Sequence, residues 1–304
     1  MGFMIDLRRL HVLRAVAHYG TVTAAARALH FTPSAASQQI RQLARDLGVD
    51  LLEPQGRGIR LTPAAESLLA HADAIQARWE QAELELHADQ DESAGLLRVG
   101  GLAGAVSALL APMAVRLRER HSRLTVSIRE LGLPESFDLL FEGAIDLAVV
   151  EATPYNPPMS DARFDQQPLL DDPFDLVVAA DHPLARRDRV DLADAAHEDW
   201  IAPVVDSACR THVMSACGAA GFTPNVVHQA VEWNVTAHLV AHGLGVALIP
   251  CLAHLTPDLP ITRIRCVGNP HRKILTCTRT GAHERPAVAA AVRELRALAK
   301  TAVA

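Results

Sequence analysis

Residues 23–60 read TAAARALHFTPSAASQQIRQLARDLGVDLLEPQGRGIR, and this stretch decides the fold of the N-terminal part of the chain. Thr32 can cap a helix and Pro33 tolerates the first helical position, so a helix is predicted to begin at about Pro33. At ~100° per residue, apolar side chains from Ala36 to Leu47 fall on one stripe, and polar side chains fall on the opposite side. One face of this helix is therefore expected to pack, and the other to be free.

A short apolar pair, Leu51 and Leu52, comes before a Gln-Gly-Arg-Gly turn, and a return strand is predicted at 59–61. With two short helices upstream, this order is typical of a winged helix-turn-helix. The free helix face carries hydroxyl, amide and guanidinium groups, which hydrogen-bond base edges and phosphates in a major groove. A solvated helix face and ordinary surface arginines are the alternatives. The candidate DNA-contacting residues are Thr32, Pro33, Ser34, Ser37, Gln38, Arg41, Arg57 and Arg60.

Charge is divided unevenly along the chain. Residues 1–62 hold eight Arg and four acidic residues and carry +4, whereas the whole chain carries −6, which leaves −10 for the remainder. Phosphate attraction supplies most of the sequence-independent affinity for DNA, so the basic segment is the part expected to contact it. The acidic remainder argues against non-specific coating of DNA.

Length and composition indicate a protein of several domains. A chain of 304 residues with 49% hydrophobic content exceeds what one core normally serves, so two or three domains are expected. The sequence has no apolar run of 18 residues, and charges interrupt its first eleven residues, which predicts a cytoplasmic protein without a membrane partner. Five cysteines, an odd number, predict reduced thiols.

The segment 63–92 is predicted to form one long helix, which Thr62 and Pro63 begin. Its apolar side chains recur in steps of four and three, the 3.5-residue repeat of a helix that meets a partner helix. A second copy of the chain is the expected partner, and packing against the chain's own C-terminal part is the alternative. The predicted dimerisation residues are Leu68, Ala72, Ile75, Trp79, Ala82 and Leu86.

From Leu96 onward, short apolar runs alternate with helical stretches in the order LLRVGG, AVSALLAPMAVRLRERH, LTVSI, PESFDLLFEGA and IDLAVV. This βαβαβ pattern predicts an α/β fold with a mostly parallel sheet covered by helices on both faces. A second unit begins near DPFDLVVAA and contains WIAP, a helix-like SACRTHVMSACGAAGF, NVVHQAV and GVALIP. The chain then returns through ILTCTR to a last helix at 286–299. Ligands of such sheets bind at the carboxyl ends of strands.

The chain resembles the LysR-type transcriptional regulators over nearly its whole length. The matching stretches are AAARALHFTPSAASQQIRQLARDLG, GRGIRLTPAAESLLAHA, VVAADHPLA at 177–185 and HGLGVALIP at 242–250. The resemblance implies a DNA-binding domain at 1–62, a linker helix at 63–92 and an effector-binding domain at 93–304. It also implies two lobes of the periplasmic-binding-protein type, 93–167 with 268–304 and then 168–267, joined by two crossing strands around a ligand cleft. The implied partners are an operator in double-stranded DNA, a small-molecule effector, a homodimer or homotetramer and RNA polymerase.

The resemblance implies effector contacts at the positions of this chain that match the cleft positions of LysR-type relatives. Relatives that bind carboxylates often have Ser or Thr after the first strand, where this chain has Ala103 and Gly104. Exposed N–H groups at a helix start could still hold an anion, whereas Glu151 and Trp233 admit a cationic or aromatic ligand. A structural role is the alternative for each residue. The candidate effector residues are Leu102, Ala103, Gly104, Glu151, Pro203, Val204, Val205, Asp206, Trp233, Asn234 and Gly245.

Other motifs argue against further functions. VGGLAG at 99–104 lacks the GxGxxG spacing of a dinucleotide site, and Leu239 stands between His238 and His242 where a zinc protease needs its Glu. No cofactor, metal or catalytic residue is therefore expected. A stand-alone solute-binding protein and an enzyme of the same two-lobe architecture are the alternatives to a regulator. Cys209 and Cys217 occupy the region of the redox pair in peroxide-sensing relatives, but eight helical positions place them ~12 Å apart, too far for a disulfide.

Overall fold

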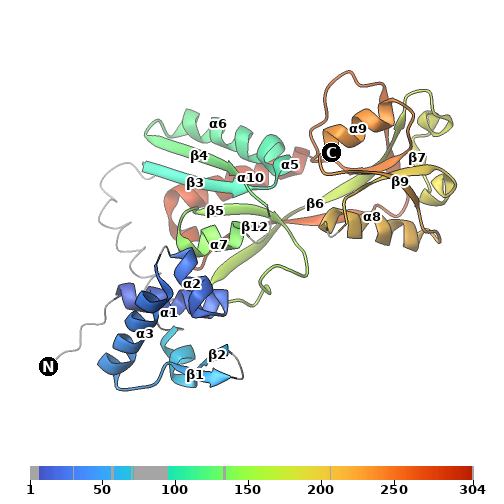
Figure 1. Cartoon of the computed structure of the whole chain (residues 1–304). Coiled ribbons are helices and arrows are strands. Elements are labelled where there is room, and N and C mark those ends of the chain that lie inside the picture. The colour runs from blue at the N-terminus through green and yellow to red at the C-terminus, as the bar shows by residue number, and fades with distance from the viewer. Residues whose placement is uncertain are drawn as a thin grey trace. The chain divides into compact units, whose positions relative to one another are not determined.

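A computed structural model of the chain describes residues 7–29, 31–55, 58–69, 71, 95–132, 135–205 and 207–302. The chain divides into two compact units, Met1–Glu83 and Leu84–Ala304. Figure 1 shows a helical unit with a small hairpin at the blue end of the chain and a larger α/β unit in the remaining colours. No helix among the described residues is long and apolar enough to cross a membrane.

The first unit is a three-helix cluster followed by a two-stranded hairpin, as the sequence predicts. The Thr21 hydroxyl accepts a hydrogen bond from the Ala24 N–H at 3.1 Å, and this cap begins the second helix. The longer helix ends at Gly48, whose φ of 69° is the left-handed conformation that glycine adopts easily. Leu13, Ala25 and other apolar residues are buried where the three helices pack together. Its elements are α1 (Leu7–Tyr19), α2 (Val22–Ala28), α3 (Pro33–Leu47), β1 (Leu52–Gln55) and β2 (Gly58–Leu61).

The second unit alternates strands and helices. Its elements are β3 (Gly95–Gly101), α5 (Ala103–Ala105), a π-helical turn (Val106–Leu110), α6 (Ala111–Arg120), β4 (Leu124–Glu130), α7 (Glu135–Glu142), β5 (Leu147–Glu151), β6 (Phe164–Ala179), β7 (Arg189–Val190), β8 (Asp199–Pro203), α8 (Ala208–Ala219), β9 (Asn225–Ala230), α9 (Trp233–Ala241), β10 (Ala247–Pro250), β11 (Ile261–Cys266), β12 (His271–Arg279) and α10 (Pro286–Ala302), with 3₁₀ turns at Pro183–Arg186, Leu192–Ala195 and Ala282–Glu284.

The larger sheet has the strand order β4-β3-β5-β12-β6-β11-β7, with β10 also paired to β6. The predicted βαβαβ run is confirmed, because β3 is parallel to both β4 and β5. The prediction of a mostly parallel sheet is wrong. β12 is antiparallel to β5 and β6, and β10 and β11 are antiparallel to β6. The reason is that the long strand β6 carries the chain from one half of the sheet to the other and β12 carries it back, so these two strands run in opposite directions.

We call the half built on β3, β4, β5 and β12 lobe I and the half built on β7 to β11 lobe II. The sixteen-residue strand β6 joins them: it pairs with β12 up to Pro173 and with β10 from Phe174. Each lobe has its own core, with Leu97 and Leu147 buried in lobe I and Trp200 buried in lobe II. The indole N–H of Trp200 donates to the Ala195 carbonyl at 3.0 Å. The predicted domain and lobe boundaries remain predictions.

Candidate functional site

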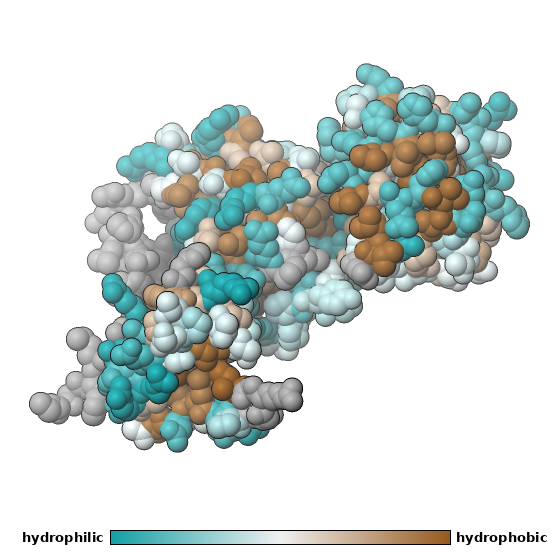
Figure 2. Space-filling model, viewed as in Figure 1, coloured by the Kyte–Doolittle hydropathy of each residue, from teal (hydrophilic) through white to brown (hydrophobic). Residues whose placement is uncertain are grey.

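The outer face of α3 is the candidate DNA-reading surface. The Thr32 hydroxyl accepts from the Ala35 N–H at 3.2 Å, so this residue caps the helix as predicted. Ile40 and Leu43 are buried, whereas Ser34, Gln38 and Arg41 are exposed, and hydrophilic side chains cover α3 in Figure 2. The amphipathic division predicted from the sequence is therefore confirmed.

The two ends of this face differ in how their side chains are engaged. Near the C-terminus of α3, the Gln42 amide donates to Asp46 at 2.7 Å, and Asp46 also forms an ion pair with Arg9 of α1. No described residue forms a hydrogen bond or ion pair with the side chain of Gln38 or Arg41. Recognition helices contact base edges mainly through their N-terminal residues, and Gln38 lies in the N-terminal half of α3, with Arg41 one turn further along.

The hairpin places its arginine beside an acid. Arg60 lies directly across from Glu53 in the antiparallel register, and its Nε donates to Glu53 Oε1 at 2.8 Å. Among the other predicted DNA contacts, Pro33 is exposed and Ser37 is half-buried, while Arg57 lies outside the described residues. Most of the segment predicted to form the long helix also lies outside them, including Ala72, Ile75, Trp79, Ala82 and Leu86. Thr62 does cap its start, and Leu68 is half-buried.

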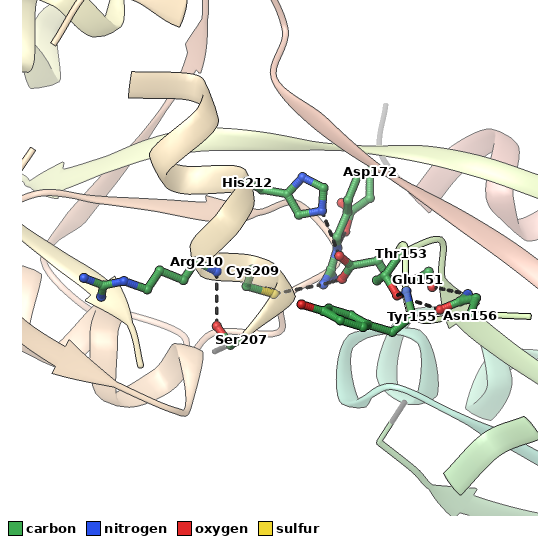
Figure 3. Close-up of polar contacts among 10 residues, drawn as sticks. Glu151, Thr153, Tyr155, Asn156, Asp172, Ser207, Cys209, Arg210 and His212 are labelled. Carbon is green, nitrogen blue, oxygen red and sulfur yellow. Dashed lines mark hydrogen bonds and ion pairs between the residues drawn. The ribbon is translucent and has the colours of Figure 1, made fainter. Parts of the chain in front are cut away.

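A buried group of charged side chains connects the two lobes of the second unit. Glu151, at the end of β5 in lobe I, is 4% exposed. Its Oε1 lies 2.8 Å from Nε2 of His212, which belongs to α8 in lobe II. Its Oε2 accepts from Nη1 of Arg272, on β12, at 3.1 Å. Both carboxylate oxygens of Glu151 are thus engaged by two cationic or proton-donating groups from different elements, and Figure 3 shows Glu151 directed toward His212.

The guanidinium of Arg272 is held on its other side by Asp172 of β6. Nε of Arg272 donates to Asp172 Oδ2 at 2.9 Å, and the second Asp172 oxygen accepts from the Leu252 N–H at 2.9 Å. Arg272 is 3% exposed, and its Nη1 also lies 3.7 Å from the Cys209 sulfur. These groups form one continuous network, which we call the inter-lobe network: Glu151, Asp172, Cys209, His212 and Arg272.

The electrostatics of the network favour an ionised Glu151. Burial alone raises the pKa of this carboxyl, but the hydrogen bond from His212 and the charge of Arg272 outweigh burial and hold the pKa below its ordinary value. Cys209 responds differently, because burial dominates over the nearby guanidinium and raises the pKa of its thiol to about 11. The network therefore pairs an ionised carboxylate with a protonated, unreactive thiol.

The glycines among the predicted effector residues are in tight contact with backbone. A Cβ on Gly104 would lie 2.7 Å from the Leu252 carbonyl oxygen, and one on Gly245 would lie 2.5 Å from that of Asp199. Gly245 also has a φ of 140°, which side-chain-bearing residues rarely adopt. Beside Gly104, Leu102 is half-buried and Ala103 is exposed, and no side chain caps this helix start. Close packing is thus a sufficient reason for both glycines.

The remaining predicted effector residues belong to lobe II and differ in environment. Pro203 is buried at the end of β8, Val204 is half-buried, and Val205 is exposed. Trp233 packs against both lobe II core clusters, and the Asn234 side-chain oxygen accepts from the Thr256 N–H at 2.7 Å. Asp206 lies outside the described residues.

Sequence reasoning missed most of the inter-lobe network. The sequence marks Glu151 as a candidate contact but not Asp172, His212 or Arg272, and it predicts only a reduced thiol for Cys209. No local motif marks these positions, since they lie on four separate elements that only the tertiary fold brings together.

Comparisons with known proteins agree with this architecture. The family model for the bacterial regulatory helix-turn-helix protein of the lysR family matches residues 7–66, and the model for the LysR substrate binding domain matches residues 90–300. This chain belongs to the LysR family of transcriptional regulators. It is a ligand-responsive, DNA-binding regulator of transcription, with an N-terminal helix-turn-helix and a two-lobed effector-binding domain.

Individual LysR-type relatives match along most of their length. The HTH-type transcriptional regulator AlsR of Bacillus subtilis is 30% identical over 265 residues, covering 85% of this chain and 84% of the relative. The Hca operon transcriptional activator HcaR of Escherichia coli is 30% identical, with 81% and 82% covered. The fold matches a full-length OxyR variant of Pseudomonas aeruginosa with a TM-score of 0.64, at 23% identity and coverage of 96% and 95%.

Proposed function

We propose that this LysR-type regulator reads its operator with the exposed face of α3, where Gln38 contacts base edges and Arg41 contacts base edges or phosphates. The observation that carries this proposal is the contrast along α3: its C-terminal polar side chains are engaged within the unit, whereas Gln38 and Arg41 are exposed with no described partner. An amide can pair bidentately with adenine, and a guanidinium with guanine.

The same proposal assigns effector sensing to the region where lobe I meets α8. Glu151 and His212 belong to different lobes, so a ligand that alters their contact changes how the lobes are held together. Differential contacts of this kind are what a ligand needs to shift a conformational equilibrium. We propose further that the working protein is a homodimer or homotetramer that acts in the cytoplasm, contacts RNA polymerase and has no enzymatic activity.

A gel-shift measurement with DNA from upstream of the protein's own gene tests operator binding. We expect a retarded complex that survives an excess of unrelated DNA of the same length, because specific sites bind roughly 10³-fold or more tighter than non-specific DNA. A complex that unrelated DNA removes equally well would contradict the proposal.

A further inference from the structure

The inter-lobe network contains a carboxylate-binding arrangement whose occupant is part of the chain. Arg272 from β12 and His212 from α8 direct one nitrogen each at the two oxygens of the Glu151 carboxylate, at 3.1 Å and 2.8 Å. Because an ionised carboxylate only accepts hydrogen bonds, both nitrogens act as donors. Charge-assisted contacts to both oxygens are the usual way in which proteins hold a carboxylate.

The two donors are positioned independently of Glu151. The Arg272 guanidinium is fixed by Asp172, which is itself held by the Leu252 N–H, each at 2.9 Å. The His212 ring packs against Phe174, with 5.7 Å between ring centroids. The donors would therefore keep their places if the Glu151 carboxylate were removed.

The backbone around Glu151 is also held by contacts that do not involve its side chain. The Asn156 amide donates to the Glu151 carbonyl at 2.9 Å, and the Thr153 hydroxyl bonds the Asn156 side-chain oxygen at 2.7 Å. This turn leaves Tyr155 86% exposed, and Figure 3 shows its ring directed toward the start of α8 near Cys209. Shortening Glu151 would thus open space between two donors that stay in place.

We propose that Glu151 is a specificity-determining residue: it fills the position between Arg272 and His212 as an internal carboxylate and so excludes small carboxylates from the effectors of this chain. The network contains two carboxylates and one guanidinium, with an imidazole that is neutral or singly charged. A further anion would add a negative charge to a buried network that has no positive charge left to pair with it. The effectors left by this exclusion are uncharged or cationic. The inference rests on the proposed sensing at the contact between lobes.

The test is to titrate acetate and benzoate into the full-length chain and into Glu151→Ala, with sodium chloride at matched ionic strength, using calorimetry and thermal unfolding. We expect no saturable binding by the wild type, and saturable binding by Glu151→Ala with an affinity at least about tenfold above the upper limit set by the wild-type titration, because the vacated donors bind the added carboxylate. Glu151→Gln fills the same space with a neutral amide and should stay unresponsive. In Glu151→Ala/His212→Phe, which lacks one donor, the gained binding should be lost.

Wild-type binding of acetate or benzoate that shifts the His212 imidazole NMR signals would overturn the proposal, as would a folded Glu151→Ala that binds neither anion. If Glu151→Ala does not fold, the wild-type titration still decides, because the proposal requires benzoate to leave the His212 signals unchanged. None of these titrations contains DNA. Their failure is thus distinguishable from failure of the operator-binding proposal, which the gel shift measures.

Discussion

At the scale of single residues, Glu151 is a residue that the sequence could select but whose environment it could not predict. Its place at the end of a predicted strand marked it as a candidate ligand contact. Its partners, His212 and Arg272, are 61 and 121 positions away, and their approach depends on how β6 and β12 cross between lobes. A local pattern carries no information about contacts of this range.

Glu151 should contribute stability that depends on pH. Its pKa in the folded chain lies below the ordinary value of 4.5, so its contribution is fully present above about pH 4.5 and is lost as the pH falls through the lower folded value. Glu151→Gln should lower the free energy of unfolding at pH 7 by roughly 3 kcal/mol, because it leaves Arg272 without one of its two buried counter-charges. Denaturant unfolding of both proteins between pH 3 and 7 checks this. A difference between them that stays constant down to pH 3 would contradict it.

The cysteines of α8 should remain reduced in peroxide. Burial raises the pKa of Cys209 to about 11 and that of Cys217 to about 12, so almost no reactive thiolate exists at neutral pH. Both residues lie on the continuous helix Ala208–Ala219, which keeps them too far apart to bond. Mass spectrometry after mild peroxide should find both as free thiols, with DNA binding unchanged. A Cys209 to Cys217 disulfide, together with loss of response in Cys209→Ser, would refute this.

At the scale of elements, helix positions and caps followed from local chemistry, whereas sheet pairing did not. Thr32 and Pro33 predicted the start of α3, and the apolar spacing predicted its buried face. The antiparallel pairing of β12 with β5 was not predictable, because strand order depends on where a long connection returns. The sequence also gave no indication that Arg60 would lie opposite Glu53.

The hairpin ion pair leads to a prediction about DNA affinity. If Arg60 leaves Glu53 to contact a phosphate, Arg60→Ala should weaken binding to all DNA sequences about equally and reduce the salt slope by ~1. Glu53→Gln is the matched control, since it frees Arg60 and should strengthen binding to all sequences. Anisotropy titrations at several salt concentrations measure both. Unchanged affinity and slope in Arg60→Ala would show that this side chain only stabilises the hairpin.

At the scale of the whole molecule, the family and the two-part architecture could be predicted because the motifs extend over nearly the whole chain. The inter-lobe network could not, since it is a property of how the lobes meet. We propose that α3 carries operator specificity and that the larger unit carries the response to an effector.

The most direct test compares the full-length wild type with Gln38→Ala/Arg41→Ala, measuring affinity for the chain's own upstream DNA and for unrelated DNA. We expect the double variant to lose most of its preference for upstream DNA, by about 1–3 kcal/mol for each lost base contact, while the unfolding transition of the larger unit is unchanged. A double variant that keeps the wild-type preference for upstream DNA would show that α3 does not carry operator specificity.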